Sequence, residues 1–135
     1  MTLLQVHFLA AGFWLGLLAA ETVLELNPRA SQPPIAIVHK WIDLLFEGPV
    51  VLLVLVTGAL LLARNWPAPP LLLVKAAVGL VPILANLYCF PLVLGRARTT
   101  DAQRALVLTR QIKLTGAAIP FAIAAFAIGL YLRPY

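Results

Sequence analysis

Four long apolar runs restrict this chain to a membrane fold. They cover roughly residues 2–24, 39–63, 70–95 and 112–132. A helix needs about 20 mostly apolar residues to cross a bilayer, so each run is long enough. Hydrophobic residues make up 62% of the chain and charged residues 11%, with a mean hydropathy of +0.97. The sequence therefore predicts an all-α, polytopic membrane protein that is one domain over residues 1–135 and contacts a lipid bilayer.

The breaks between the runs predict how the helices connect. Turn-forming residues stand at Asn27-Pro28, at Pro33-Pro34 and at Asn65-Trp66-Pro67. The second connection is so short that it permits only antiparallel neighbours. We expect an up-down-up-down bundle of four transmembrane helices, with both termini on the same side. Thr100-x-x-Gln103 resembles a capping box, so the fourth helix is expected to begin near residue 100 and to project into water.

The basic residues predict the orientation in the membrane. Loops one and three and the adjoining helix ends carry most of them, at Arg29, Lys40, Arg96, Arg98, Arg104, Arg110 and Lys113, whereas the termini and loop two carry Arg64 and Arg133. Cytoplasmic loops carry an excess of Lys and Arg. Loops one and three are therefore expected in the cytoplasm and the termini outside, in a bacterial-type inner membrane. This distribution accounts for the net charge of +5, so no nucleic-acid partner is expected.

Four ionisable residues lie at the cytoplasmic edge of the first two runs. They are Glu21, and His39, Asp43 and Glu47 at spacing i, i+4, i+8, which places the last three on one helix stripe. Ionisable groups within a membrane are costly unless they are paired, hydrated or bound to a ligand. Carboxylates and imidazoles that converge from separate helices form metal sites in helix bundles. The set predicts a site for a divalent transition metal ion such as Zn, Mn or Fe.

This cluster has two other interpretations. One is an ordinary ion-pair network at the membrane interface, in which Lys113 or Arg110 neutralises Asp43 and Glu47. The other is contact with a larger cofactor or a proton relay. Asn86 lies deeper on the same side and is a candidate cofactor-binding residue.

A second polar layer is expected near the opposite membrane surface. His7 and Lys75 each lie about five residues into a span from that side, roughly 7 Å below the surface. A buried neutral histidine can ligate haem iron or a transition metal. A lysine in apolar surroundings can act as a base or pair with an anionic group such as a propionate. The alternative is a histidine at the interface and a lysine that snorkels to the outer surface.

The order of these features resembles the HemJ-type protoporphyrinogen oxidases and, more distantly, the CopD-like membrane proteins. The similarity is a pattern over most of the chain. It consists of His7 followed by Phe13-Trp14-Leu15-Gly16-Leu17, Gly48-Pro49 followed by Val56-Thr57-Gly58, Leu72-Leu73-Val74-Lys75, a basic third loop, and the end Leu132-Arg133-Pro134-Tyr135.

The resemblance implies a haem-binding bundle, with haem b as the cofactor, that oxidises protoporphyrinogen IX. Its functional pair falls on His7 and Lys75, and Asn86 stands nearest to a further family histidine. The family's Trp and Lys ahead of the first histidine are absent from residues 3–5. The cluster of carboxylates with His39 lies outside the family signature.

Two other functions fit the sequence. A metal-handling membrane protein would use the cytoplasmic cluster, and a non-catalytic accessory subunit would dock on a larger membrane complex. Gly12-x-x-x-Gly16 permits close helix approach, either within the bundle or in a homodimer. Soluble enzyme classes find no support, because the sequence has no glycine-rich phosphate loop.

Overall fold

The structure, a computed structural model, describes residues 1–132, and all of its regular elements are helical. The Arg133-Pro134-Tyr135 end that contributes to the resemblance lies outside the described residues. Four helical units are long and apolar enough to cross a membrane, and they are Leu3–Leu26, Pro33–Arg64, Pro70–Arg98 and Ala102–Leu132. The chain is therefore an all-α, multi-pass membrane protein, as the sequence predicts.

The helical units divide into shorter elements where the turn type changes. The elements are α1 (Leu3–Leu26), α2 (Pro33–Ile42), the π-helical turn η1 (Asp43–Glu47), α3 (Gly48–Arg64), α4 (Pro70–Arg98), α5 (Ala102–Thr115), the 3₁₀ turn η2 (Gly116–Ala118) and α6 (Ile119–Leu132).

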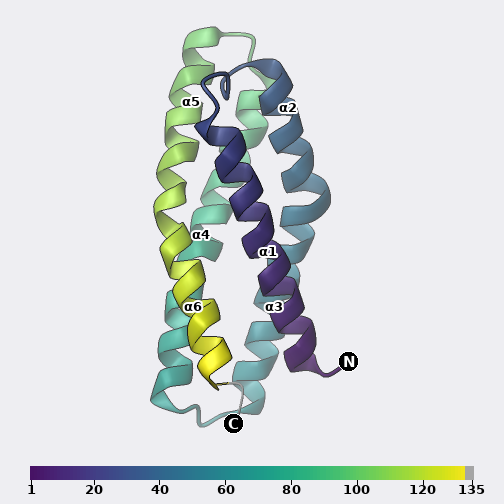
Figure 1. Cartoon of the computed structure of the whole chain (residues 1–135), viewed down its shortest axis with the longest axis vertical. Coiled ribbons are helices and arrows are strands. Elements are labelled where there is room, and N and C mark those ends of the chain that lie inside the picture. The colour runs from purple at the N-terminus through teal and green to yellow at the C-terminus, as the bar shows by residue number, and fades with distance from the viewer. Residues whose placement is uncertain (133–135) are drawn as a thin grey trace.

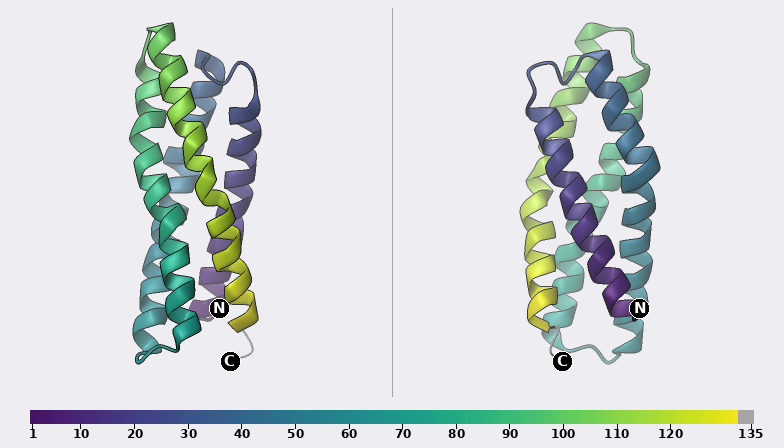
Figure 2. Two further views of the ribbon diagram at one scale, coloured as in Figure 1. Left: turned by 90° about the vertical axis from the view of Figure 1, so that its left-hand side faces the viewer. Right: turned by 45° about the vertical axis from the view of Figure 1, so that its right-hand side comes forward.

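The four units lie side by side as an antiparallel bundle (Figures 1 and 2). Helix α1 packs on α3, α4 packs on α2 and α3, and α5 and α6 pack on α4 and return to α1. The start of α1 and the end of α6 lie at the same end of the bundle (Figure 1). The α4–α5 connection extends beyond the α1–α2 connection at the other end (Figure 1).

Local chemistry fixes where each helix begins. The Thr2 side chain accepts from the Gln5 backbone N–H at 3.2 Å, and the Gln5 side chain accepts from the Thr2 N–H at 2.8 Å, which is a complete capping box. The second unit begins at Pro33, ahead of the expected start at residue 39. Proline suits the first turn of a helix because its missing N–H would have no partner there. His39 consequently lies well inside a helix.

The fourth unit begins with a different cap from the expected one. Asp101, rather than Thr100, is the N-cap residue, and its side chain accepts from the Gln103 backbone N–H at 2.9 Å. Helix α5 then continues through η2 into α6 as one span.

A π turn interrupts the second unit at the depth of the acidic cluster. The Gly48 N–H bonds to the carbonyl of Asp43, five residues back. Pro49 follows; it has no N–H, and its ring crowds the carbonyl of Leu45, so the wider turn relieves a contact that a regular helix would impose. Both Asp43 and Glu47, at the two ends of this turn, are 2% exposed.

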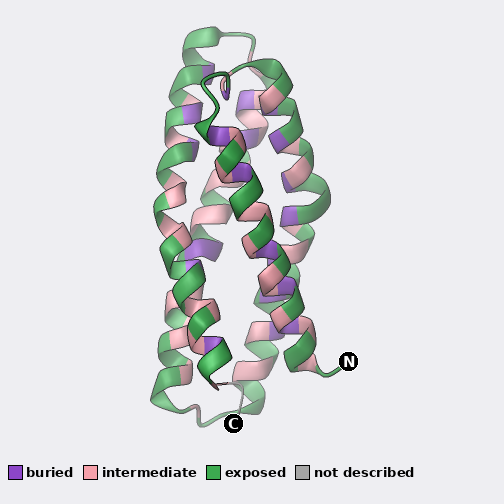
Figure 3. Ribbon diagram, viewed as in Figure 1, coloured by how far each residue is buried: buried purple, intermediate pink, exposed green. Residues whose placement is uncertain are grey.

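Apolar side chains face outward as well as inward. Figure 3 shows exposed residues along the outer faces of every helix. In a bilayer these outward-facing side chains contact lipid. Many of the residues that are buried between the helices are small or polar instead. A small apolar core at Ala10, Trp14, Val51, Val54 and Ile83 joins α1, α3 and α4. Polar side chains are buried on both sides of it along the bundle.

Candidate functional site

The first buried polar group joins three helices near the start of α1. His7 Nδ1 lies 2.8 Å from Thr57 Oγ1 of α3, and His7 Nε2 lies 3.3 Å from Lys75 Nζ of α4. The expected depth match between His7 and Lys75 is thus a direct contact across the bundle.

These contacts fix the tautomer of His7. The Thr57 hydroxyl donates its proton to the Leu53 carbonyl at 2.6 Å, so it accepts from His7 Nδ1–H. The Nε2 atom of the neutral ring then carries a lone pair and accepts from Lys75, whose ammonium group can only donate. An imidazole anchored through Nδ1–H with an unprotonated Nε2 is the form that ligates iron or another metal once the contact with Lys75 is released.

Two glycines make room for this pair. A Cβ atom on Gly58 of α3 would lie 3.2 Å from His7 Cε1, and one on Gly129 of α6 would lie 2.8 Å from Lys75 Cε. All four spans therefore shape the site, through α1, α3, α4 and α6.

A large apolar cavity opens beside His7 and Lys75. Its volume is about 510 Å³, and Phe8, Trp14 and Phe126 are among the aromatic side chains in its wall. Ligand pockets are mostly apolar with a few polar groups that fix orientation, and this cavity has that composition.

The second buried polar group centres on His39 at the other end of the bundle. Its Nδ1 atom lies 2.5 Å from Glu25 Oε1. Its Nε2 atom lies 3.3 Å from Asp43 Oδ1 and 3.9 Å from Glu21 Oε2. The structure thus brings together three of the four residues of the predicted metal set.

Arg96 completes this group from α4. It donates from both terminal nitrogens to the two oxygens of Glu25, at 2.9 and 2.7 Å, and to Thr109 Oγ1 at 3.3 Å. From the sequence, Arg96 was expected in the basic third loop, and Glu25 was not among the predicted site residues. The available signal was that Glu25 follows Glu21 by one helical turn, which puts both carboxylates on one face.

The expected ion pairs of Lys113 and Arg110 are not formed. Within residues 1–132, no ion pair joins either side chain to Asp43 or Glu47. Arg96 is the guanidinium that enters the cluster, because it lies on the inner face of α4 and is 2% exposed.

Three buried polar atoms of the cluster, Glu21 Oε1, Asp43 Oδ1 and Arg96 Nε, have no hydrogen-bond partner among the described residues. Glu21 Oε1 and Asp43 Oδ1 accept no hydrogen bond from the described residues, although their side chains are 9% and 2% exposed. One ligand atom from each of Glu21, His39 and Asp43 lies within 4.8 Å of the others.

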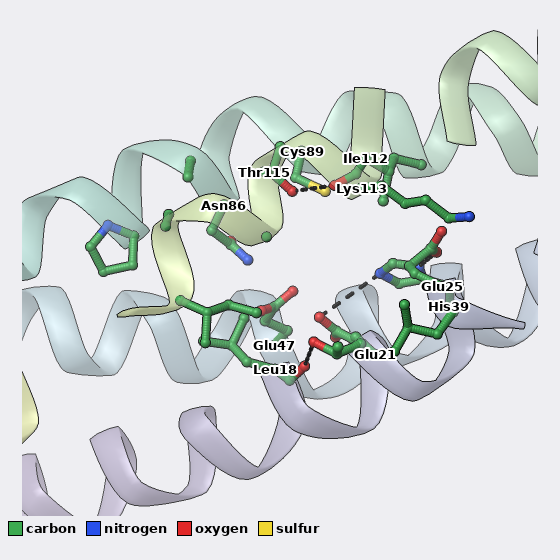
Figure 4. A pocket seen from close by; sticks show the side chains of 17 residues that line it. Leu18, Glu21, Glu25, His39, Glu47, Asn86, Cys89, Ile112, Lys113 and Thr115 are labelled. Atoms are coloured by element: carbon green, nitrogen blue, oxygen red, sulfur yellow. Dashed lines mark hydrogen bonds and ion pairs between the residues drawn. The ribbon is translucent and has the colours of Figure 1, made fainter. Parts of the chain in front are cut away.

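Glu47 lies beside this group and has a partner of its own. Its Oε1 atom accepts from the indole N–H of Trp14 at 2.9 Å. Glu47 and Asn86 line a cavity of about 210 Å³ together with Glu21 and His39 (Figure 4). Figure 4 shows the carboxylates entering this cavity from one wall and Asn86 and Cys89 from the opposite wall.

The two glycines of the Gly12-x-x-x-Gly16 motif differ in their surroundings. A Cβ atom on Gly12 would meet the Phe126 ring at 3.8 Å, whereas one on Gly16 would meet nothing within 4 Å. Gly12 thus faces helix α6 of the same bundle, and Gly16 lies on an exposed face.

In comparisons with protein-family models, curated proteins and solved structures, nothing matches this chain. Fold and sites therefore define it only as a multi-pass, all-helical membrane protein with two buried polar groups. The resemblance to the HemJ-type family therefore stays a prediction from the sequence.

Proposed function

We propose that this protein binds a tetrapyrrole, haem b or a porphyrin, in the apolar cavity beside His7 and Lys75. One observation carries the proposal: a histidine with its Nε2 lone pair free of a proton lies in the wall of a cavity of about 510 Å³. A well-formed apolar pocket on which a few polar groups converge is the default hypothesis for a ligand site.

The residues present fit such a ligand. His7 offers a neutral imidazole nitrogen, which is the axial ligand that haem iron most often takes. Lys75 offers a cation on a flexible stem at the same depth, so it can leave Nε2 and pair with a propionate. Bound haem would supply one-electron chemistry at its iron.

The activity we propose on this basis is the one the resemblance implies, oxidation of protoporphyrinogen IX. That reaction removes hydrogen from the ring as protons and electrons. With the porphyrinogen rather than haem in the cavity, His7 Nε2 carries no iron and can accept a proton from the ring. The electrons pass to a separate acceptor.

The test uses the two histidines of the chain as controls for each other, since the sequence holds two. The full chain is purified in detergent, supplied with haemin, and its absorption spectrum recorded. We expect a Soret band in the wild type and in His39→Gln, and its loss or shift in His7→Gln. A wild type that takes up no haemin and no protoporphyrin contradicts the proposal, and so does an unchanged band in His7→Gln.

We also propose that the protein resides in a bacterial-type inner membrane with loops one and three in the cytoplasm. The basic residues near those loops support this orientation. The measurement is labelling in intact cells by an impermeant thiol reagent, in a Cys89→Ser background. Ala68→Cys in loop two should be labelled, and Ser31→Cys in loop one should be protected. The reverse pattern contradicts the orientation.

A homodimer, if formed, would use Gly16 rather than Gly12. Gly16 has open space around it, whereas Gly12 faces Phe126 of its own chain. Small exposed residues on a membrane helix permit close approach of a second helix. A shift from dimer to monomer in Gly16→Leu, measured by light scattering in detergent, is the expected result. A wild type that is monomeric contradicts it.

A further inference from the structure

The cluster around His39 is separate from the tetrapyrrole cavity and has no role there. Its hydrogen bonds show which side of the imidazole is free. The Nδ1 atom lies 2.5 Å from Glu25 Oε1, and that carboxylate is held from its far side by both terminal nitrogens of Arg96. Arg96 Nη2 also lies 2.9 Å from Nδ1, but it donates to Glu25 Oε1, so the carboxylate oxygen beside Nδ1 takes the Nδ1 proton. In the neutral ring the lone pair is then on Nε2, which points away from Glu25.

The free side of His39 faces two carboxylates. Asp43 Oδ1 and Glu21 Oε2 lie 3.3 and 3.9 Å from Nε2. One oxygen of Asp43 and one of Glu21 accept no hydrogen bond from the described residues, and both residues are more than nine-tenths buried. Asp43 Oδ1 is both the unpartnered atom and the one that faces Nε2, whereas Glu21 faces Nε2 with Oε2 and its Oε1 has no partner. A lone pair and carboxylate oxygens this close repel one another unless a proton or a metal cation lies between them.

With all four carboxylates ionised and His39 neutral, a cation would also offset the charge of the group. Four buried carboxylates, those of Glu21, Glu25, Asp43 and Glu47, are opposed by one buried guanidinium, that of Arg96. With His39 neutral, the group carries three negative charges inside an apolar bundle, which is costly. A divalent ion would leave one, and Lys113, at the wall of the adjoining cavity, carries the opposite charge.

We infer that Glu21, His39 Nε2 and Asp43 bind one divalent transition metal ion, such as Zn²⁺, Mn²⁺ or Co²⁺. One imidazole nitrogen and two carboxylate oxygens suit this class of ion. Glu25, clamped by Arg96, is the positioning residue that orients the ligating imidazole.

The ion would keep a coordination position for exchangeable ligands. Glu21 and His39 line the cavity of about 210 Å³ shown in Figure 4, which has room for several water molecules or a small molecule. Three protein ligands with one position open to such a space are typical of reactive rather than structural metal sites. Glu47 Oε1 is engaged by the Trp14 indole N–H and is not one of the three ligands.

The test is a metal titration of the purified full chain, without a histidine tag, after removal of metal with a chelator. Calorimetry with Zn²⁺ should give one ion per chain. Asp43→Asn and Glu21→Gln preserve shape but remove a ligand charge, so binding should fall by more than about 100-fold. Glu25→Gln should weaken it by about 10- to 100-fold, the range seen when a group that orients a metal ligand is changed. Asp101→Asn, at an exposed helix cap, is the matched control and should bind as the wild type does.

A second measurement identifies the ligating nitrogen in the wild type directly. Pulsed electron paramagnetic resonance of bound Mn²⁺ should show coupling to one imidazole nitrogen, lost in His39→Gln and retained in His7→Gln. Absence of metal binding in the wild type overturns the inference, because a proton on His39 Nε2 would then be enough to offset the charge of Asp43 and Glu21. Equal effects of Asp43→Asn and Asp101→Asn also overturn it. Haemin uptake is scored in the same preparations, so failure of either site is distinguishable from failure of the other.

Discussion

Arg96 and Glu25, separated by 71 residues in sequence, form a bidentate ion pair inside the bundle, with Nη1–Oε2 at 2.9 Å and Nη2–Oε1 at 2.7 Å. The same guanidinium contacts Thr109 at 3.3 Å and lies 2.9 Å from His39 Nδ1. One side chain of α4 thereby joins α1, α2 and α5. Loops one and three end next to this pair, so it fixes the geometry of that end of the bundle.

Loss of Arg96 should destabilise the protein strongly. Arg96→Met leaves the Glu25 carboxylate buried without its partner, and breaking a buried pair from one side costs about 3–5 kcal/mol. Arg96→Lys should recover part of this, because an ammonium cannot bond both oxygens as a fork does. The measurement is unfolding in mixed micelles, followed by circular dichroism.

The exposed Arg104 supplies the control for that experiment. Arg104→Met should change the unfolding free energy by no more than about 0.5 kcal/mol. In a double-mutant cycle, Glu25→Leu with Arg96→Met should cost less than the two single changes added together. Additive costs would show that the pair does not contribute as a unit.

Gly129 should tolerate no side chain, whereas Gly16 should accept one. Gly129→Ala places a methyl group 2.8 Å from Lys75 Cε and 3.2 Å from Phe8 Cζ, so Lys75 must shift away from His7. We expect a cost of about 1–3 kcal/mol, as for other overpacked interiors, and weaker haemin uptake. Gly16→Ala meets nothing within 4 Å and should be close to neutral in both measurements. Equal behaviour of the two variants would contradict the arrangement of Gly129 and Lys75.

Trp14 should stabilise the protein through its indole N–H as well as its ring. Trp14→Phe retains an aromatic side chain but leaves buried Glu47 Oε1 without the donor at 2.9 Å. A hydrogen bond to a charged group contributes about 1.5–3 kcal/mol, and the unfolding free energy should fall by that amount. Glu47→Gln keeps an acceptor for Trp14 and should cost less. If Trp14→Phe is as stable as the wild type, the hydrogen bond does not contribute to stability.

Deletion of Leu45 should disrupt the cluster by converting the π turn to a regular helix. Removing one residue rotates everything ahead of it by about 100° relative to α3. His39 and Asp43 would turn away from Glu21, so Zn²⁺ binding should disappear. Leu45 is 60% exposed, so Leu45→Ala is a control that removes the side chain but retains the register, and it should bind Zn²⁺ normally. Retained binding after the deletion would show that the π turn does not set the register.

Much of the fold was predictable because membrane crossing depends on length and composition. Apolar runs broken by proline and asparagine gave four spans, and depth along each span placed His7 level with Lys75. Depth also placed Glu21 level with His39 and Asp43. The start of the second span was less predictable, because Pro33 can end one segment or begin the next.

The sequence did not predict which side of each helix points into the bundle. The spans are apolar on all sides, since lipid and protein interior favour the same side chains, so no hydrophobic stripe shows which face points inward. Glu25 and Arg96 were therefore missed as partners, and Lys113 and Arg110 were expected in their place.

By itself, then, the sequence determined that this chain crosses a membrane in four helices and at which depths its polar residues lie. The tertiary structure decided which of them meet. It left His7 Nε2 unprotonated through the Thr57 contact and within reach of Lys75, and it set His39 between Glu25 on one side and Asp43 and Glu21 on the other. The physical reason is that depth follows from counting residues along one helix, whereas contact depends on the rotation of each helix about its axis. Packing between helices sets that rotation, and here the π turn at Asp43–Glu47 shifts it within a single span.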